Sequence, residues 1–230
     1  TRKMIDTPMG YETEGIVQVW IENSEDFCFS EIASLPCVEK LGRSMDRIAG
    51  PSFISYNLNS GDETLNIQSI NMNREALDVL GIRLIEILKE RATMICYTES
   101  SVKKIEPLGK VEYEGVVSDF RTGLAKDINE FVLQTVFITK LEELLHYGYA
   151  KVVGDGRDAV REIRELLVSR GVPEDAFSVA LLEDIIAEGY ASERKTLTVI
   201  SAFSILSLLL TALAILALSS YWVRMQARDS

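Results

Sequence analysis

The sequence predicts an α+β protein: a ferredoxin-like split βαβ layer, an inserted subdomain made mostly of β-strands, and a C-terminal stalk and transmembrane helix. Three observations predict this fold. Strand–helix–strand patterns lie near both ends of the first 182 residues, and strand-like segments with short helices lie between them. The third observation is that residues 196–223 contain no charged side chain, which is typical of a membrane-spanning helix.

The first strand–helix–strand unit of the split layer is predicted within residues 1–58. Residues 15–22 alternate apolar and polar side chains, as a half-buried strand does, and a helical stretch opens at Ser24 and closes at Pro36. Residues 38–48 can return as the second strand. We therefore expect a strand, a helix and a second strand in this order.

The second half is predicted within residues 146–182. Residues 149–153 are strand-like, and residues 158–167 form an amphipathic helix that stops at Gly171, with Pro173 after it. Residues 177–182 form the next predicted strand. Two such units make the split βαβ layer, in which helices cover one face of a sheet.

An inserted, mostly β subdomain is predicted over residues 59–145. No low-complexity linker separates it from its surroundings, so we expect the two parts to share an interface. Its predicted strands are residues 53–59, 65–72, 94–97, 111–120 and 131–139, and its predicted short helices are residues 74–80 and 100–105.

A stalk helix is predicted over residues 183–195. Ile185 and Ile186 lie on one side of it, and the segment enters the apolar stretch without a proline. A continuous helix would couple motion of the preceding domain to the membrane, whereas Gly189 could act as a break or a hinge. The paired acids Glu183 and Asp184 are most simply a solvated face of this helix.

The membrane span is predicted over residues 196–223, followed by the start of a cytoplasmic segment at 224–230. The stretch exceeds the roughly 20 residues that cross a bilayer, and a buried core helix of this length would be expected to show a charged face. Lys195, Tyr221, Trp222 and Arg224 are the predicted interface residues. Basic residues flank both ends equally, so charge alone leaves the orientation open.

Small or hydroxyl side chains recur every three or four residues along the span. Helices in lipid associate by close approach, which small side chains at this spacing permit, although serine and threonine are also common in single spans. We therefore predict a seam that packs against other membrane helices, formed by Ser204, Ser207, Thr211 and Ala214.

The charge of the chain is strongly uneven. The whole sequence has a formal net charge of -11, and residues 1–195 carry 22 basic and 34 acidic side chains, a net charge of -12. A nucleic-acid-binding protein needs a basic surface, so nucleic acid is not expected as a partner. The sequence thus predicts an acidic domain attached to an uncharged span.

The sequence contains few residues for catalysis, so we predict neither an enzyme nor a cofactor or metal site. The cluster 154–156 lacks the Lys-Ser of a phosphate-binding loop and is typical of a strand-to-helix turn. His146 is the only histidine, and a solvated position at a helix end is expected for it. Three cysteines are expected as buried small side chains, while a disulfide between Cys28 and Cys37 stays open.

Four segments resemble, in order and spacing, motifs of MacB-like and FtsX-like ABC transporter permeases. Within this family, they most resemble the large permeases of the Bacteroidetes type. Thr98 stands where the family favours asparagine, Leu88 and Lys89 replace its usual Gly-Arg after Glu86, and its histidine-containing loop is missing after Phe120. The segments are NREALDVLGIRLIE at 73–86, ICYTESSVKKI at 95–105, EPLGK at 106–110 and YEGVVSDF at 113–120.

This resemblance implies a permease in the cytoplasmic (inner) membrane, with residues up to about 195 on the extracytoplasmic side. It further implies an ABC ATPase as a separate subunit, more transmembrane helices before and after this chain, a homodimer, membrane lipid and an extracytoplasmic protein partner. In such a permease, ATP-driven motion is transmitted mechanically to the extracytoplasmic domain. The alternative is a single-span anchored binding or sensor domain that works without an ATPase.

Overall fold

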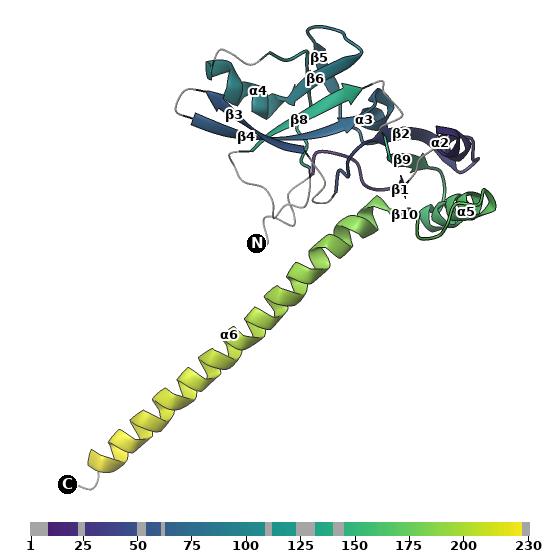
Figure 1. Cartoon of the computed structure of the whole chain (residues 1–230). Helices are drawn as coiled ribbons and strands as arrows, with labels where there is room; N and C mark the ends of the chain where they lie inside the picture. Colours follow the sequence, from purple (N-terminus) through teal and green to yellow (C-terminus); the bar gives the residue numbers. More distant parts are fainter. Residues whose placement is uncertain are drawn as a thin grey trace. The chain divides into compact units, whose positions relative to one another are not determined.

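A computed structural model describes residues 9–22, 26–49, 54–60, 63–108, 112–122, 132–139 and 145–226 of the 230-residue chain. The chain divides into two compact units, Thr1–Ala187 and Glu188–Ser230. The first unit consists of one mixed sheet with helices packed on it, and the second consists mainly of the long helix α6 (Figure 1).

One half of the sheet has the strand order β10–β1–β9–β2, with every neighbour antiparallel. Helix α2 joins β1 to β2 and helix α5 joins β9 to β10, which is the split βαβ arrangement that the sequence predicts. We call this part the first half. Its elements are β1 (Ile16–Ile21), α2 (Asp26–Ala33), β2 (Val38–Ser44), β9 (Tyr147–Val152), α5 (Gly156–Ser169) and β10 (Phe177–Leu181).

The other half continues the same sheet in the order β4–β8–β6–β7–β5, and β3 pairs with β4. We call this part the arm. It mixes parallel pairs (β4 with β8, β6 with β7) and antiparallel ones (β8 with β6, β5 with β7). Its elements are β3 (Ile54–Ser60), β4 (Glu63–Met72), α3 (Arg74–Val79), β5 (Leu84–Ile87), β6 (Thr93–Thr98), α4 (Glu99–Ile105), the 3-10 turn η1 (Glu106–Leu108), β7 (Gly115–Val117) and β8 (Val132–Thr139).

The largest hydrophobic cluster, which we call the central core, is built by both halves. It includes Ile16 and Tyr149 from the first half and Ile70, Met72 and Val136 from the arm, all fully buried. The α+β fold class is therefore confirmed. The domain bounds at 58/59 and 145/146 stay predictions, because the sheet and the central core run through both parts.

Two predicted strands are shorter than expected. The strand predicted over 38–48 ends at Ser44, where the chain turns and the backbone carbonyl of Asp46 accepts a hydrogen bond from the Ser44 hydroxyl at 2.8 Å. The strand predicted over 111–120 is reduced to β7 (Gly115–Val117), which lies between β5 and β6 and pairs with both. Alternation alone therefore overestimated the lengths of these two strands.

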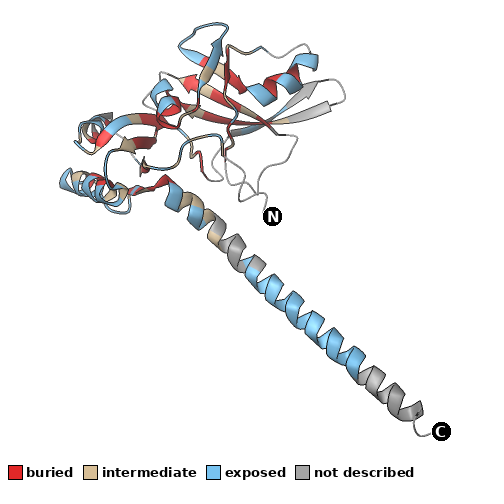
Figure 2. Ribbon diagram, turned by 180° about the vertical axis from the view of Figure 1, so that it is seen from behind, coloured by how far each residue is buried: buried red, intermediate tan, exposed pale blue. Residues whose placement is uncertain are grey.

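Helix α6 (Leu182–Gln226) is 45 residues long. Within it, Thr198–Leu216 is apolar enough to cross a membrane, with a mean hydropathy of 2.5 and none of the stretch buried. Figure 2 shows this part of α6 exposed, whereas the buried residues gather in the sheet. The structure thus contains one candidate span among the described residues, where the sequence predicts it.

Candidate functional site

The base of helix α6 is anchored in the first unit. Leu182 is fully buried in the central core, and Ile185 and Ile186 pack half-buried against the same cluster. Their spacing of three and four residues places them on one side of the helix, while Glu183 and Asp184 are exposed. The predicted stalk residues therefore lie at the point where α6 leaves the sheet.

Gly189, the predicted hinge, lies inside α6 and two residues after the end of the first unit. A glycine within a helix costs about 1 kcal/mol relative to alanine, so it locally lowers helix stability. Its role as a hinge stays a prediction.

Helix α3 is the second structural feature that could carry function. The side chain of Asn73, only 6% exposed, caps it: Oδ1 accepts from the backbone N–H of Ala76 at 2.9 Å and from that of Arg43 at 2.8 Å. At the other end Gly81 has φ +65°, a left-handed conformation that glycine adopts without strain. Asn73 thus connects α3, in the arm, to β2, in the first half.

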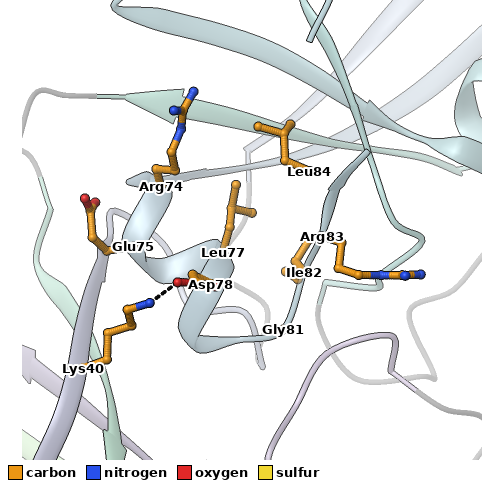
Figure 3. Close-up of a pocket in the computed structure, with 9 residues that line it drawn as sticks. All are labelled: Lys40, Arg74, Glu75, Leu77, Asp78, Gly81, Ile82, Arg83 and Leu84. Carbon is orange, nitrogen blue, oxygen red and sulfur yellow. Dashed lines mark hydrogen bonds and ion pairs between the residues drawn. The ribbon is translucent and has the colours of Figure 1, made fainter. Parts of the chain in front are cut away.

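A cavity of about 680 Å³ lies beside α3 (Figure 3). An ion pair between Lys40 on β2 and Asp78 on α3 closes one side of it, so both halves of the sheet contribute to its wall. Its size lies within the range of small-ligand pockets, but it is open and its rim is charged. It is lined by Lys40, Arg74, Glu75, Leu77, Asp78, Gly81, Ile82, Arg83 and Leu84.

The motif residues that carry the family resemblance have structural roles. The Thr98 hydroxyl caps α4 by accepting from the N–H of Ser101 at 3.3 Å, so threonine supplies the cap oxygen that asparagine would supply. Asp119 Oδ1 accepts from the N–H of Ser100 at 2.9 Å, and Phe120 is buried in the central core. These three residues thus position helix α4 or fill the central core.

A buried polar network that sequence reasoning missed joins β4 to β8. Gln68 and Gln134 lie opposite each other in the parallel pair, and the Gln134 amide nitrogen donates to Gln68 Oε1 at 3.0 Å. The Thr122 hydroxyl donates to Gln134 Oε1 at 2.9 Å. Isolated glutamines in strands give no sequence signal, because only the strand register brings them together.

The described residues contain no group of three or more metal-binding side chains. The turn 154–156 is built as predicted: Gly154 has φ +88°, and Asp155 caps α5 by accepting from the N–H of Arg157 at 2.7 Å. His146 lies in a segment without regular secondary structure directly before β9, and it is half-buried rather than solvated as expected. The preceding residues 141–144, which would form the expected helix, lie outside the described residues.

The three cysteines are free thiols in the structure. Cys28 and Cys96 are buried, as predicted, and Cys37 is half-buried. Burial, helped by a hydrogen bond to Glu162, raises the pKa of Cys37 to about 11, and burial raises the pKa of Cys96 to about 12. Thiols of this kind are poor nucleophiles at neutral pH.

The predicted membrane residues divide into two groups. Ser204, Ser207, Thr211 and Ala214 are exposed on α6, and the hydroxyls of Ser204 and Thr211 donate to the carbonyls of Ile200 and Ser207 at 2.9 and 2.8 Å. The side chains of the predicted interface residues Lys195, Tyr221, Trp222 and Arg224 lie outside the described part of the chain. Both assignments stay predictions.

Comparison with known proteins finds similar structures but no similar sequences. No family model and no curated protein matches the chain. The extracellular domain of the ABC-type transporter YknZ from Gram-positive bacteria is similar over 72% of this chain and 99% of its own, with 13% identity and a TM-score of 0.45. A domain assigned to a permease protein of Porphyromonas gingivalis is similar over 76% of this chain and 93% of its own, with 13% identity and a TM-score of 0.46.

Proposed function

We propose that the chain is part of a permease subunit of a MacB/FtsX-type ABC transporter, located in the cytoplasmic membrane. Residues up to about 195 would form the extracytoplasmic domain and α6 would cross the membrane. The ordered motifs between residues 73 and 120 support this assignment, as does the candidate span Thr198–Leu216 that follows the domain.

One observation carries the proposed mechanism. The helix that contains the candidate span begins inside the domain, with Leu182, Ile185 and Ile186 packed on the central core. A close-packed core transmits displacement because it cannot deform continuously. Motion of α6, driven by ATP hydrolysis in a partner subunit, would therefore move the extracytoplasmic domain and act on a substrate or a partner protein.

The proposed partners are an ABC ATPase subunit, other membrane helices, a second copy of the chain, an extracytoplasmic protein and membrane lipid. The hydroxyls of Ser204 and Thr211 already donate within α6. The seam would therefore act chiefly through close approach of helix backbones rather than through hydrogen bonds donated to a neighbour.

The test starts from the full-length protein in its native membrane. It is purified with an affinity tag in mild detergent, and co-purified proteins and ATP hydrolysis are measured. Recovery of an ABC ATPase with ATP-hydrolysing activity supports the permease, whereas an anchored binding or sensor domain would be recovered without one.

A second experiment tests mechanical coupling in that complex. A short Gly-Ser stretch is inserted after Glu188, and the same stretch is inserted after exposed Glu174, in the turn before β10, as a control. We expect the first insertion to preserve ATP hydrolysis but to remove ATP-dependent changes in hydrogen exchange of residues 9–187. The control should keep both ATP hydrolysis and the ATP-dependent exchange changes. If these exchange changes persist in the variant with the insertion after Glu188, the coupling mechanism is wrong.

A further inference from the structure

The first half and the arm are joined in the sheet by fewer residue pairs than the other neighbouring strands share. Strands β2 and β4 share a single residue pair, Ser44 with Met72, whereas β4 and β8 share seven pairs and β1 and β9 share five. A junction this thin could act as a hinge between the two halves. Whether it bends depends on the contacts around it, which we call the joint.

Hydrogen bonds close the joint on both sides of that pair. The Met45 N–H donates to the Asn71 carbonyl at 2.8 Å, and the Asn73 N–H donates to the Arg43 carbonyl at 2.9 Å. The Arg43 N–H donates back to Asn73 Oδ1 at 2.8 Å. Asn73 and Arg43 thus exchange two hydrogen bonds at a buried position, where breaking them leaves polar groups unsatisfied.

Helix α3 packs directly on β2, the strand of the first half that forms the joint. A Cβ atom on Gly42 would lie 2.1 Å from the Cα of Ala76, so helix and strand approach to backbone contact. The Lys40–Asp78 ion pair adds a second connection from β2 to α3, as Figure 3 shows. Helix α3, which belongs to the arm, is therefore held directly against β2 of the first half.

The segment before β1 also connects the two halves. The Glu12 N–H donates to the carbonyl of Leu80, just after α3, and the Glu12 carboxylate pairs with Lys151 on β9 at 3.1 Å. Three residues earlier, the Met9 carbonyl accepts from the N–H of Arg121 in the arm at 2.9 Å. Contacts of the sheet, of α3 and of this segment therefore all hold the two halves together at the joint.

We infer that α3, held by Asn73, is a brace that makes the first half and the arm one rigid lever. The base of α6 packs on the same central core that runs under the joint. In the permease of the proposed function, on which this consequence rests, displacement of α6 therefore reaches the arm without being lost at the joint. The arm presents an exposed apolar strand end, with Ile85, Ile87 and Leu88 at 47, 44 and 52% exposure.

Hydrogen exchange of the full-length protein in detergent tests the brace without requiring an ATPase. A rigid joint opens only when the sheet itself opens, so the amides of Arg43, Met45 and Asn73 should exchange within about tenfold of the β1 amides that pair with β9. A flexible hinge would instead open while the rest of the sheet stays closed, so its amides would exchange faster than those of β1. Joint amides that exchange more than about tenfold faster than those of β1 would overturn the brace.

Asn73 is a positioning residue in this scheme, and its variants separate the brace from a local helix cap. Asn73→Ala removes the acceptor, whereas Asn73→Asp keeps a cap oxygen and is the matched control. Local loss of the cap would speed exchange only at Arg43 and Ala76, the donors to Asn73 Oδ1. Failure of the brace should also speed exchange at least about tenfold at Met45, whose amide does not contact Asn73.

The outcomes separate this inference from the proposed function. Unchanged exchange at Met45 in Asn73→Ala overturns the brace, even where an ABC ATPase co-purifies with the protein. Conversely, a rigid joint in a protein recovered without an ATPase leaves the brace standing and removes only its role in ATP-driven motion.

Discussion

Gly42 offers the sharpest stability test of the contact between α3 and β2. In Gly42→Ala the new Cβ would lie 2.1 Å from the Ala76 Cα and 2.2 Å from its backbone nitrogen. Ordinary contact begins at 3.4 Å, so the helix or the strand must move by more than 1 Å. Because the obstructing atoms are backbone, no side-chain rotation relieves the clash.

The expected cost follows from three terms. Overpacking of this kind costs about 1–3 kcal/mol. Displacement of α3 also weakens the Asn73 cap, for about another 1 kcal/mol. Replacing glycine by alanine returns about 0.5–1 kcal/mol by restricting the unfolded chain. The net loss in the free energy of unfolding is therefore about 1–3.5 kcal/mol.

Urea denaturation of the full-length protein in detergent measures this loss. Trp20 packs half-buried against the central core, and Trp222 is the only other tryptophan, so a Trp222→Phe background makes Trp20 fluorescence the probe. With a denaturant slope of about 2 kcal/mol per M, the midpoint should fall by roughly 0.5–1.8 M. The slope itself should not change.

Two variants serve as controls for Gly42→Ala. In Gly148→Ala on β9, the new Cβ would meet side-chain atoms of the buried Phe29 ring at 2.8 Å rather than backbone atoms, so a smaller loss is expected than for Gly42→Ala. Adding Ala76→Gly to Gly42→Ala should not rescue stability, because the clash is with backbone atoms that remain. Rescue by Ala76→Gly, or a loss below about 0.5 kcal/mol for Gly42→Ala, would refute the backbone contact.

Two further predictions concern titratable groups of the first unit. Burial raises the pKa of Asp46 above its usual value of 3.8. The folded state therefore favours the protonated carboxyl, and this contribution to stability is lost as the pH rises through the folded-state pKa. Asp46→Asn should therefore raise the free energy of unfolding at pH 7 and raise it less at pH 4. Urea titrations at both values check this, and a gain that grows at pH 4 would contradict it. At pH 8, Cys37 should react with iodoacetamide about two orders of magnitude slower than an unperturbed thiol, and Cys96 about three orders slower, because little thiolate is present. Glu162→Gln should speed only Cys37 in mass-spectrometric labelling, and fast reaction of Cys37 in the unaltered chain would contradict its raised pKa.

The strongly periodic elements were predictable from the sequence. The apolar positions of α5 recur at Ala159, Ile163 and Leu167, all buried, and the helix was predicted within two residues of both ends. The uncharged stretch of α6 was equally clear, because a window of this hydropathy has few structural alternatives. Local sequence is sufficient where one element's own pattern decides its structure.

The joint could not be predicted, because its contacts are long-range. Nothing beside Gly42 in sequence indicates that Ala76 will press against it, and the two residues meet only after β2 and α3 are placed. Asn73 did carry a local signal, since asparagine before a helix is a common cap. Its second role, accepting from Arg43, depends on the position of the arm and has no sequence signature.

The positions where this chain departs from the family pattern suggest where specificity would lie in a permease. Thr98 is buried and still caps α4, so that departure preserves the local structure. Leu88 and Lys89, in place of Gly-Arg, lie instead at the exposed end of β5, next to Ile85 and Ile87. If the proposed permease moves as one rigid lever, this end of the arm would move with α6, and changes there would alter what the arm contacts without altering the joint. We therefore expect substrate or partner choice to depend on the exposed end of β5, and the transmission of motion to depend on the joint.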